Sequence, residues 1–436
     1  MKITGVAINN FKGLDSVVFR PKTINILVGR NNTGKTSILE SIAIGFIENF
    51  LSGYESKPSS VINYLQSGAE IEFELAGNPR EVTRIEIRKS SIEEIIKSLR
   101  DELQKILEDL KRDGFAYLAS RFSSPETVAR NRKLLKSLDN AALQASIDKS
   151  FETIDKETIV DIADECIVVR LNNIVNQYMG IKYSQTLRSL LRNFESILLK
   201  DVLNIKVEPS RRTALDFYWS QIGLARTNIF DIGVEPVITR KKEPSAMVNA
   251  IYVKDPIKYL KSLRDKGENL QKLAFDIESI IKSEGVVPNM LRFNFDSIVF
   301  ETSEGNKEVS MNMMGDGFRT LVSILSVLKS SPKGSIILLE EPEVHLHPGY
   351  VKQFVRYLIS LSRSTNIQLF ISTHSYDLIE YLILDETMPK EDREFLDREM
   401  MVLRLSRTDD TVVSEEMDYP TVSSSLKNLL LDLRGV

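Results

Sequence analysis

Apolar runs and helix-like periodicity alternate at both ends of the chain. Residues 24–28 form an apolar run that predicts a buried strand, and apolar residues between 38 and 50 recur every three or four positions, as on one face of a helix. Near the C-terminal end, the apolar runs 335–339 and 367–372 are likewise separated by a helical stretch, 350–362. This alternation of strands and helices predicts an α/β fold.

The pattern changes in the middle of the chain. Residues 70–75 and 82–87 alternate in polarity on either side of a Gly-Asn-Pro turn and predict a β-hairpin with one solvent-facing side. From about residue 89 the apolar spacing is helical, first in a stripe over 92–110 that is too short for a long coiled-coil arm. Further helical patterns cover 159–178, 187–199 and 257–281, and strands are expected again at 291–295, 297–300, 401–405 and 410–415, before a helix over 422–433.

Composition is that of an ordinary globular protein. Of the 436 residues, 27% are charged and 42% are hydrophobic, and the net charge is −4. The one cysteine, Cys166, can form neither an internal disulfide nor a zinc knuckle. The first residues lack the charged and apolar regions of a leader peptide, and no apolar run is long enough to span a bilayer. We therefore expect a cytoplasmic protein with no membrane partner.

Basic residues gather in the central helical region and make double-stranded DNA a candidate partner. The clusters are Arg130/Arg132/Lys133, Arg211/Arg212 and Arg240/Lys241/Lys242. Such clusters are more often a solvated surface, so an interpretation without nucleic acid stays open.

The turn between the first apolar run and its helix has the spacing of a phosphate-binding loop. It reads G-x-x-x-x-G-K-T from Gly29 to Thr36. Backbone amides at a helix N-terminus point toward a bound anion, so such a loop binds the phosphates of a nucleoside triphosphate. Lys35 is expected to contact the β- and γ-phosphates, and the Thr36 hydroxyl to bind Mg²⁺. The expected phosphate-binding residues are Gly29, Arg30, Asn31, Asn32, Thr33, Gly34, Lys35, Thr36 and Ser37.

Two acids follow the apolar run 335–339. Glu340 is expected to hold Mg²⁺ together with Thr36, and Glu341 to orient or deprotonate the attacking water. His374 ends the next buried strand, which would bring it beside the γ-phosphate. A plain strand-end turn and a structural histidine are the simpler interpretations, but the upstream phosphate loop favours the catalytic ones.

In this order, the motifs resemble the ABC-type ATPase head of the SMC, RecF and OLD group. The resemblance covers roughly 1–50 and 290–385. It is carried by four elements: an Asn-Phe-Lys-Gly turn at 10–13, the phosphate loop at 29–37, a Glu-Glu-Pro-Glu element that precedes Leu-His-Pro at 340–348, and a Ser-Thr-His-Ser switch at 372–375. It implies a P-loop NTPase of ABC-ATPase type. The two halves of the head would be 1–88 and 291–436, with a mostly helical insertion, 89–290, between them.

The resemblance also implies roles for residues outside the phosphate loop. Lys12 would touch the nucleotide phosphates. Residues 314–319 take the place of the ABC signature motif, whose Gly315 and Gly317 would close on the nucleotide of a second protomer. The protein would then be a homodimer that sandwiches ATP and Mg²⁺ between its heads.

Several positions depart from the pattern of that group. Glu340 stands where the group usually has aspartate, and Gly315 stands where a serine is expected. No Q-loop glutamine is evident, and Gln66 and Gln221 are weak candidates. Residues 209–212 are similar to a Pro-Ala-x-Arg segment of some relatives that have a single head.

Two classes of function follow from the resemblance. The first is an ATPase that acts in DNA repair, recombination or anti-phage defence. The alternative is an ATP-gated interaction switch that controls a separate effector protein without contacting DNA. A transporter motor fits less well because of the large insertion, and the region after His374 lacks the acidic triad of the OLD nucleases, so any nuclease would be a separate protein.

Overall fold

The chain folds into two compact units in the computed structural model. Unit 1 comprises Met1–Glu48, Ala69–Ile85 and Lys242–Val436, and unit 2 comprises Asn49–Gly68 and Glu86–Lys241. The structure describes residues 2–48, 50–54, 57–77, 81–109, 140–172, 174–197, 236–237, 249–258, 260, 270–283, 285, 287–408 and 411–428. Within these ranges, no helix combines the length and the apolar character that a membrane span needs.

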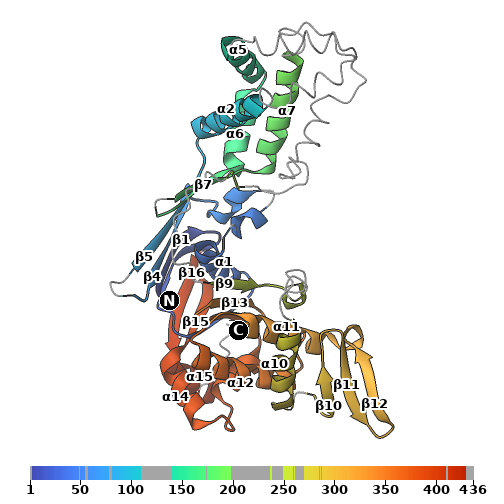
Figure 1. Ribbon diagram of the computed structural model, residues 1–436. Coiled ribbons are helices and arrows are strands. Elements are labelled where there is room, and N and C mark those ends of the chain that lie inside the picture. The colour runs from blue at the N-terminus through green and yellow to red at the C-terminus, as the bar shows by residue number, and fades with distance from the viewer. Residues whose placement is uncertain are drawn as a thin grey trace. The chain divides into compact units, whose positions relative to one another are not determined.

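Unit 1 is built around a six-stranded sheet (Figure 1). The strand order is β16-β15-β3-β14-β13-β9, and all neighbours run parallel except β15 and β16. Their bounds are β3 Ile24–Gly29, β9 Ala250–Val253, β13 Ile336–Glu340, β14 Gln368–Thr373, β15 Met400–Thr408 and β16 Thr411–Asp418. Ser372 of β14 lies beside both Leu27 and Glu340, so the carboxyl ends of β3, β13 and β14 meet at one edge of the sheet.

Helices cover both faces of this sheet, as expected for an α/β fold (Figure 1). On one face lies α1, Lys35–Phe46, which directly follows β3 and packs on β13 and β9. On the other face, several helices and alternate strand residues such as Ile337 and Leu339 share one apolar cluster. These helices are α10 Leu270–Ser283, α11 Asp316–Ser330, α12 Pro348–Thr365, α13 Tyr376–Ile383, α14 Lys390–Glu399 and α15 Tyr419–Asn428. Because side chains alternate along a strand, Leu338 and Glu340 face α1 instead.

The position of β9 corrects the predicted extent of the insertion, 89–290. β9 pairs in parallel with β13, with Tyr252 beside Leu338 and Val253 beside Leu339. α10, which lies in the same stretch of sequence, packs into the apolar cluster of unit 1. Unit 2 ends at Lys241, and the short apolar strand β9, which comes later in the sequence, belongs to the six-stranded sheet of unit 1.

An antiparallel sheet forms the second layer of strands in unit 1. The strands of this sheet that lie in unit 1 have the order β2-β1-β4-β5, and the predicted hairpin at 70–87 corresponds to β4 and β5. The bounds are β1 Ile3–Phe11, β2 Leu14–Phe19, β4 Gly68–Leu75 and β5 Glu81–Lys89, of which the last residues of β5 belong to unit 2. Buried Gln368 links the two sheets: its amide accepts from Ile3 N over 2.9 Å and donates to Ile3 O over 2.8 Å and to Lys22 O over 2.9 Å.

A third, three-stranded antiparallel sheet precedes α11 (Figure 1). It consists of β10 Met290–Phe293, β11 Ser297–Thr302 and β12 Gly305–Ser310. The first two strands were predicted from their apolar residues, whereas β12 is polar and mostly exposed and carries no apolar signal. A 3-10 turn, Met311–Met313, joins β12 to the signature region.

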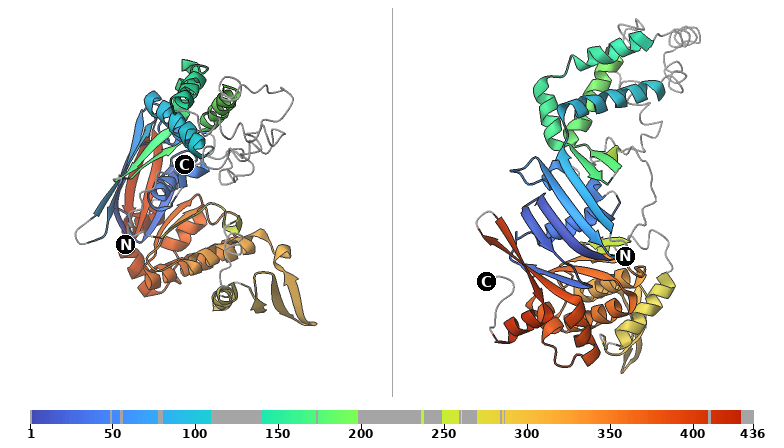
Figure 2. Two further views of the ribbon diagram at one scale, coloured as in Figure 1. Left: turned by 45° about the horizontal axis from the view of Figure 1, so that its top comes forward. Right: turned by 90° about the vertical axis from the view of Figure 1, so that its left-hand side faces the viewer.

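Unit 2 is largely helical, as predicted (Figure 2). Its elements are α2 Ile92–Asp109, α5 Asn140–Phe151, α6 Lys156–Glu165, β6 Ile167–Leu171, β7 Ile174–Tyr178, α7 Ile181–Ile197 and β8 Pro236–Val237. The predicted helix over 159–178 is wrong in its second half, which forms the β6–β7 hairpin. Asn172 turns this hairpin with φ 50°, and the β-branched residues on either side of it favour strands.

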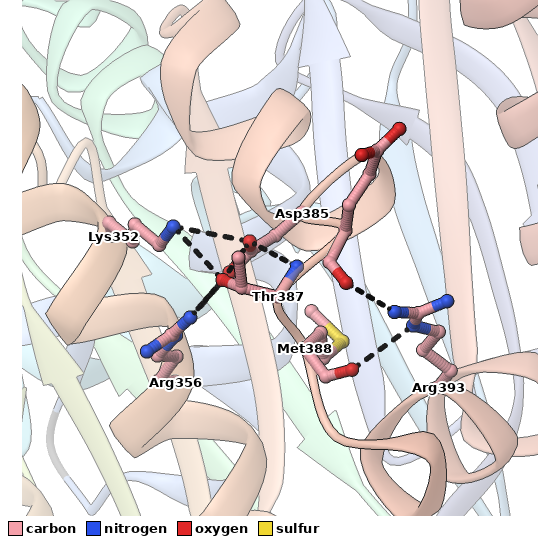
Figure 3. A network of polar contacts seen from close by, with 7 residues as sticks. Lys352, Arg356, Asp385, Thr387, Met388 and Arg393 are labelled. Carbon is pink, nitrogen blue, oxygen red and sulfur yellow. Dashed lines mark hydrogen bonds and ion pairs between the residues drawn. The ribbon is translucent and has the colours of Figure 1, made fainter.

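A buried aspartate anchors the segment after α13 to α12 (Figure 3). Asp385 receives the ammonium of Lys352 at 3.1 Å and the guanidinium of Arg356 at 3.0 Å, and it accepts from Thr387 N over 3.0 Å. The same segment is also held by Arg393, from α14 (Lys390–Glu399), which donates to the carbonyl oxygens of Glu386 and Met388. Burial alone would raise the pKa of Asp385, but the hydrogen bonds outweigh it and lower the pKa to about 2.

Candidate functional site

The phosphate loop leaves β3 and enters α1 through two residues whose backbone conformations require glycine. Gly29 has φ 149°, and a Cβ there would collide with the carbonyl oxygen of Leu405 on β15. Gly34 has φ 95°, and a Cβ there would collide with Leu14. Both values lie in the region that only glycine adopts without strain. Between them, Arg30, Asn31 and Asn32 are exposed, and Thr33 is buried.

Lys35 is curled onto its own loop. Its ammonium donates to Gly29 O over 2.8 Å and to Arg30 O over 2.9 Å. Burial lowers the pKa of this ammonium, and the charges of Glu341 and Glu340 oppose the shift. The side chain is thus held at the loop by two neutral carbonyl groups, contacts that it can exchange for phosphate oxygens.

Thr36 and Glu340 lie together, although 304 residues separate them in sequence. The Thr36 hydroxyl donates to Glu340 Oε1 over 2.6 Å. Tyr252, on β9, donates its hydroxyl to Glu340 Oε2 over 2.6 Å, and the Lys254 ammonium lies 3.7 Å from the same oxygen. A hydroxyl and a carboxylate are hard oxygen donors of the kind that Mg²⁺ prefers. The donor set of Thr36 and Glu340 therefore fits a magnesium ion.

Glu341 and His374 form the second pair of the site. His374 Nε2 lies 3.4 Å from Glu341 Oε1, and both side chains are about one-third exposed. Glu341 has φ 45°, and its amide donates to Ser372 O on the neighbouring strand over 3.0 Å. The predicted acids and histidine thus lie on adjacent strand ends.

A third carboxylate, Glu343, lies behind this pair, and the sequence analysis assigns it no role. Glu343 is 8% exposed, and its Oε1 accepts hydrogen bonds from the Thr373 hydroxyl and from His374 N, the latter over 3.3 Å. Its Oε2 is buried and accepts no hydrogen bond among the described residues. Burial raises the pKa of this carboxyl. Glu343 therefore fixes the backbone from which His374 projects.

The signature region packs against the turn that follows the two acids. Gly315 caps α11, and a Cβ added to Gly317 would lie 2.5 Å from His345 O. His345 has φ 78°, and His347 caps α12 by accepting from Gly349 N over 3.2 Å. The two histidines thus shape a turn, and the glycine at 317 lets this turn approach α11 closely.

Other residues from the sequence analysis lie in several places. Lys12 has φ 52° in the turn between β1 and β2, and its ammonium pairs with Glu40 of α1. Gln66 lies in unit 2, outside the unit that carries the phosphate loop. Gln221, residues 209–212 and the three basic clusters lie outside the described residues. Ser37 is half-buried on the first turn of α1.

Two residues that contact Glu340 are only weakly indicated by the sequence. Tyr252 lies in an apolar tetrapeptide, 250–253, and Lys254 is the next residue. Both stand in a region whose overall pattern is helical. The length of the tetrapeptide and the proline at 256 are compatible with a short strand, but neither feature places it beside Glu340. That neighbour is determined by sheet pairing, which is a tertiary property.

Comparisons with known proteins agree with this geometry. The AAA ATPase domain family matches residues 1–379. The uncharacterized protein MJECL11 of Methanocaldococcus jannaschii is 26% identical over 122 residues, which are 28% of this chain and 100% of that protein. The DNA replication and repair protein RecF of Francisella tularensis subsp. novicida is 30% identical over 203 residues, which are 45% of this chain and 54% of RecF. The alignment thus spans about half the length of RecF.

Among solved structures, the SMC head domain from Thermotoga maritima aligns with a TM-score of 0.42 and 10% identity, covering 96% of this chain and 100% of that chain. The α/β fold with its phosphate loop is evident from the sheet and helices themselves. Because the family match spans most of its length, the chain belongs to the AAA ATPase domain family.

Proposed function

We propose that this protein hydrolyses ATP with Mg²⁺ and uses the cycle to open and close a homodimer. The observation that carries the proposal is the convergence of two pairs, Thr36 with Glu340 and Glu341 with His374, at the sheet edge from which the phosphate loop leaves. One pair has the chemistry of a metal site, and the other has the chemistry of a base with its orienting partner.

Different residues of the chain bind the phosphates and the metal. The loop amides and the Lys35 ammonium bind the β- and γ-phosphates, after Lys35 leaves the carbonyl groups of Gly29 and Arg30. Thr36 and Glu340 would hold Mg²⁺, which neutralises charge on the phosphate oxygens. Because phosphoryl transfer depends on positioning and charge stabilisation, this arrangement supplies most of what hydrolysis needs.

Glu341 supplies the remaining step. Its carboxylate accepts a proton from the attacking water as the water oxygen bonds to the γ-phosphorus, and the bond to the ADP oxygen breaks. His374 lies 3.4 Å from Glu341 and orients that carboxylate. Glu343 holds the backbone of His374 in place. Glu341 and His374 thus act at the attacking water, and Glu343 acts through the backbone of His374.

The wider role follows by similarity. RecF proteins are named for DNA replication and repair, and they align with 45% of this chain. We therefore place the ATPase in a DNA transaction such as repair, recombination or defence, with unit 2 as its DNA-binding or partner-binding part. A second copy would supply Gly315 and Gly317 to the nucleotide. A separate effector protein is the alternative target of the same switch.

Steady-state ATP hydrolysis, measured with and without linear duplex DNA, tests the proposal. Glu341→Gln is expected to lower kcat by about 100-fold, because it removes the proton acceptor while retaining the shape. DNA is expected to stimulate wild-type turnover at low salt and to lose this effect at high salt, since phosphate contacts release counterions.

The outcomes separate the two roles. Turnover that ignores DNA at every salt concentration would favour the partner-controlled switch over the DNA transaction. Full turnover in Glu341→Gln would remove Glu341 from the mechanism altogether.

A further inference from the structure

Strand β9 brings two side chains to the carboxylate of Glu340. The Tyr252 hydroxyl donates to Oε2 over 2.6 Å, on the opposite side from the Thr36 hydroxyl, which donates to Oε1 over 2.6 Å. The Lys254 ammonium lies 3.7 Å from Oε2. The Glu340 side chain is 12% exposed, so three groups of the protein surround a largely buried carboxylate.

The sheet itself dictates this arrangement. Tyr252 lies beside Leu338 in the parallel β9–β13 pair, and Val253 lies beside Leu339. Val253 and Leu339 belong to the apolar cluster on one face. Side chains alternate along strands, so Tyr252 and Lys254 share the other face with Glu340 and α1. Both groups therefore reach the carboxylate because of strand register.

The chemistry of glutamate explains why such support is needed. A glutamate carries one more rotatable bond than an aspartate, and each free rotamer costs entropy when a ligand fixes it. With Oε2 held by Tyr252, the carboxylate presents Oε1 beside Thr36 in one orientation. Hydrogen bonds of this kind orient metal ligands and alter metal affinity.

Lys254 has the opposite effect on metal binding at Glu340. Its side chain is 67% exposed, so it can leave Glu340 without disturbing the sheet. An ammonium and a divalent cation repel each other at close range, and both are attracted to the same carboxylate. We propose that Tyr252 positions Glu340 for Mg²⁺, and that Lys254 compensates the carboxylate charge until the ion displaces it.

This inference rests on the proposed function, and nucleotide binding tests it apart from turnover. The dissociation constant of mant-AMP-PNP, a fluorescent analogue that resists hydrolysis, is measured in EDTA and in Mg²⁺. The dissociation constant in EDTA divided by the dissociation constant in Mg²⁺ is a ratio that measures the coupling between metal and nucleotide. Glu340→Gln defines the ratio that remains when the metal ligand is lost.

Opposite shifts are expected for the two side chains. Tyr252→Phe is expected to lower the ratio about tenfold without changing the affinity in EDTA. Lys254→Met is expected to raise the ratio, because it removes a competing cation. The matched controls are Tyr357→Phe, at a half-buried tyrosine of α12, and Lys258→Met, at an exposed lysine that pairs with Asp255; both should leave the ratio unchanged.

Results other than these would overturn a specific part of the proposal. A wild-type ratio in Tyr252→Phe would overturn the positioning role. An unchanged or lowered ratio in Lys254→Met would overturn the exchange role, and this variant alters only an exposed side chain, so folding does not confound it. Failure of the wild-type protein to bind the analogue would instead refute the proposed function, a result distinct from equal ratios in wild type and variants.

Discussion

At the scale of single residues, Glu343 has an unusual position for a carboxylate. It is 8% exposed, it supports Thr373 and His374 through one oxygen, and its other oxygen is buried without a hydrogen bond among the described residues. Burial raises the pKa of this group, because a charge is costly to remove from water. Its ionisation therefore works against folding while its hydrogen bonds organise the site.

Replacing this carboxyl by an amide should change how stability depends on pH. A raised pKa in the folded state means that the stabilising contribution of Glu343 is complete below the unfolded pKa, about 4.3, and declines as pH rises through the folded pKa. Glu343→Gln keeps an acceptor oxygen and cannot ionise. We expect its melting temperature, relative to wild type, to rise between pH 4 and pH 8, as measured by circular dichroism.

An exposed glutamate provides the comparison for that experiment. Glu304 pairs with Lys307 at the surface, and its side chain is 76% exposed. Glu304→Gln should show no such trend with pH. A constant difference between Glu343→Gln and wild type across the range would show that burial of Glu343 does not affect its titration.

Most residues of the site could be predicted from the sequence because their motifs are local. The phosphate loop and the Glu340–Glu341 pair are defined by spacing within a few residues, and each follows a recognisable strand. Glu343 and Tyr252 could not be assigned in this way, since their roles depend on contacts with Thr373 and Glu340 across the sheet.

At the scale of elements, prediction succeeded where burial imposed one clear period. The buried strands β3, β13 and β14 read as continuous apolar runs, as strands covered on both faces do. It failed for the β6–β7 hairpin, where apolar residues at mixed spacing fit a helix as well as two strands. The charged helix α14 was not predicted, because Leu396 is its one fully buried residue and carries too little pattern.

The link between α12 and the segment after α13 should depend on Asp385. This side chain is 4% exposed and holds Lys352 and Arg356, so Asp385→Asn leaves two cations without their counter-charge (Figure 3). We expect a loss of about 2 kcal/mol in the free energy of unfolding at pH 7, measured by urea denaturation. Glu304→Gln, which breaks an exposed pair, should leave this free energy nearly unchanged.

The effect of Asp385 should also vanish in acid. Its folded pKa of about 2 lies below the usual value near 3.9, so its contribution is complete above pH 4 and is lost as pH falls toward 2. The difference between wild type and Asp385→Asn should therefore shrink over that interval. A difference that persists at pH 2 would assign the stabilisation to packing rather than to charge.

At the scale of the whole molecule, the proposed homodimer predicts that a second copy covers residues 314–319. Gly317 packs on the turn that contains His345, so the start of α11 and this turn form one structural element. Two large apolar side chains near it in sequence are exposed, Met313 at 81% and Val344 at 45%. Exposed apolar groups are typical of surfaces that become buried on association.

A charge at Met313 should prevent ATP-dependent dimerisation without altering the nucleotide site of its own head. In the Glu341→Gln background, which slows hydrolysis, we expect ATP and Mg²⁺ to double the mass measured by light scattering. Met313→Glu should remain monomeric, since burying an unpaired carboxylate at an interface is costly. Phe275→Glu, at a 68% exposed residue of α10, should dimerise normally. Normal dimerisation of Met313→Glu would place the interface elsewhere, and a constant mass in ATP would mean that the head works as a monomer.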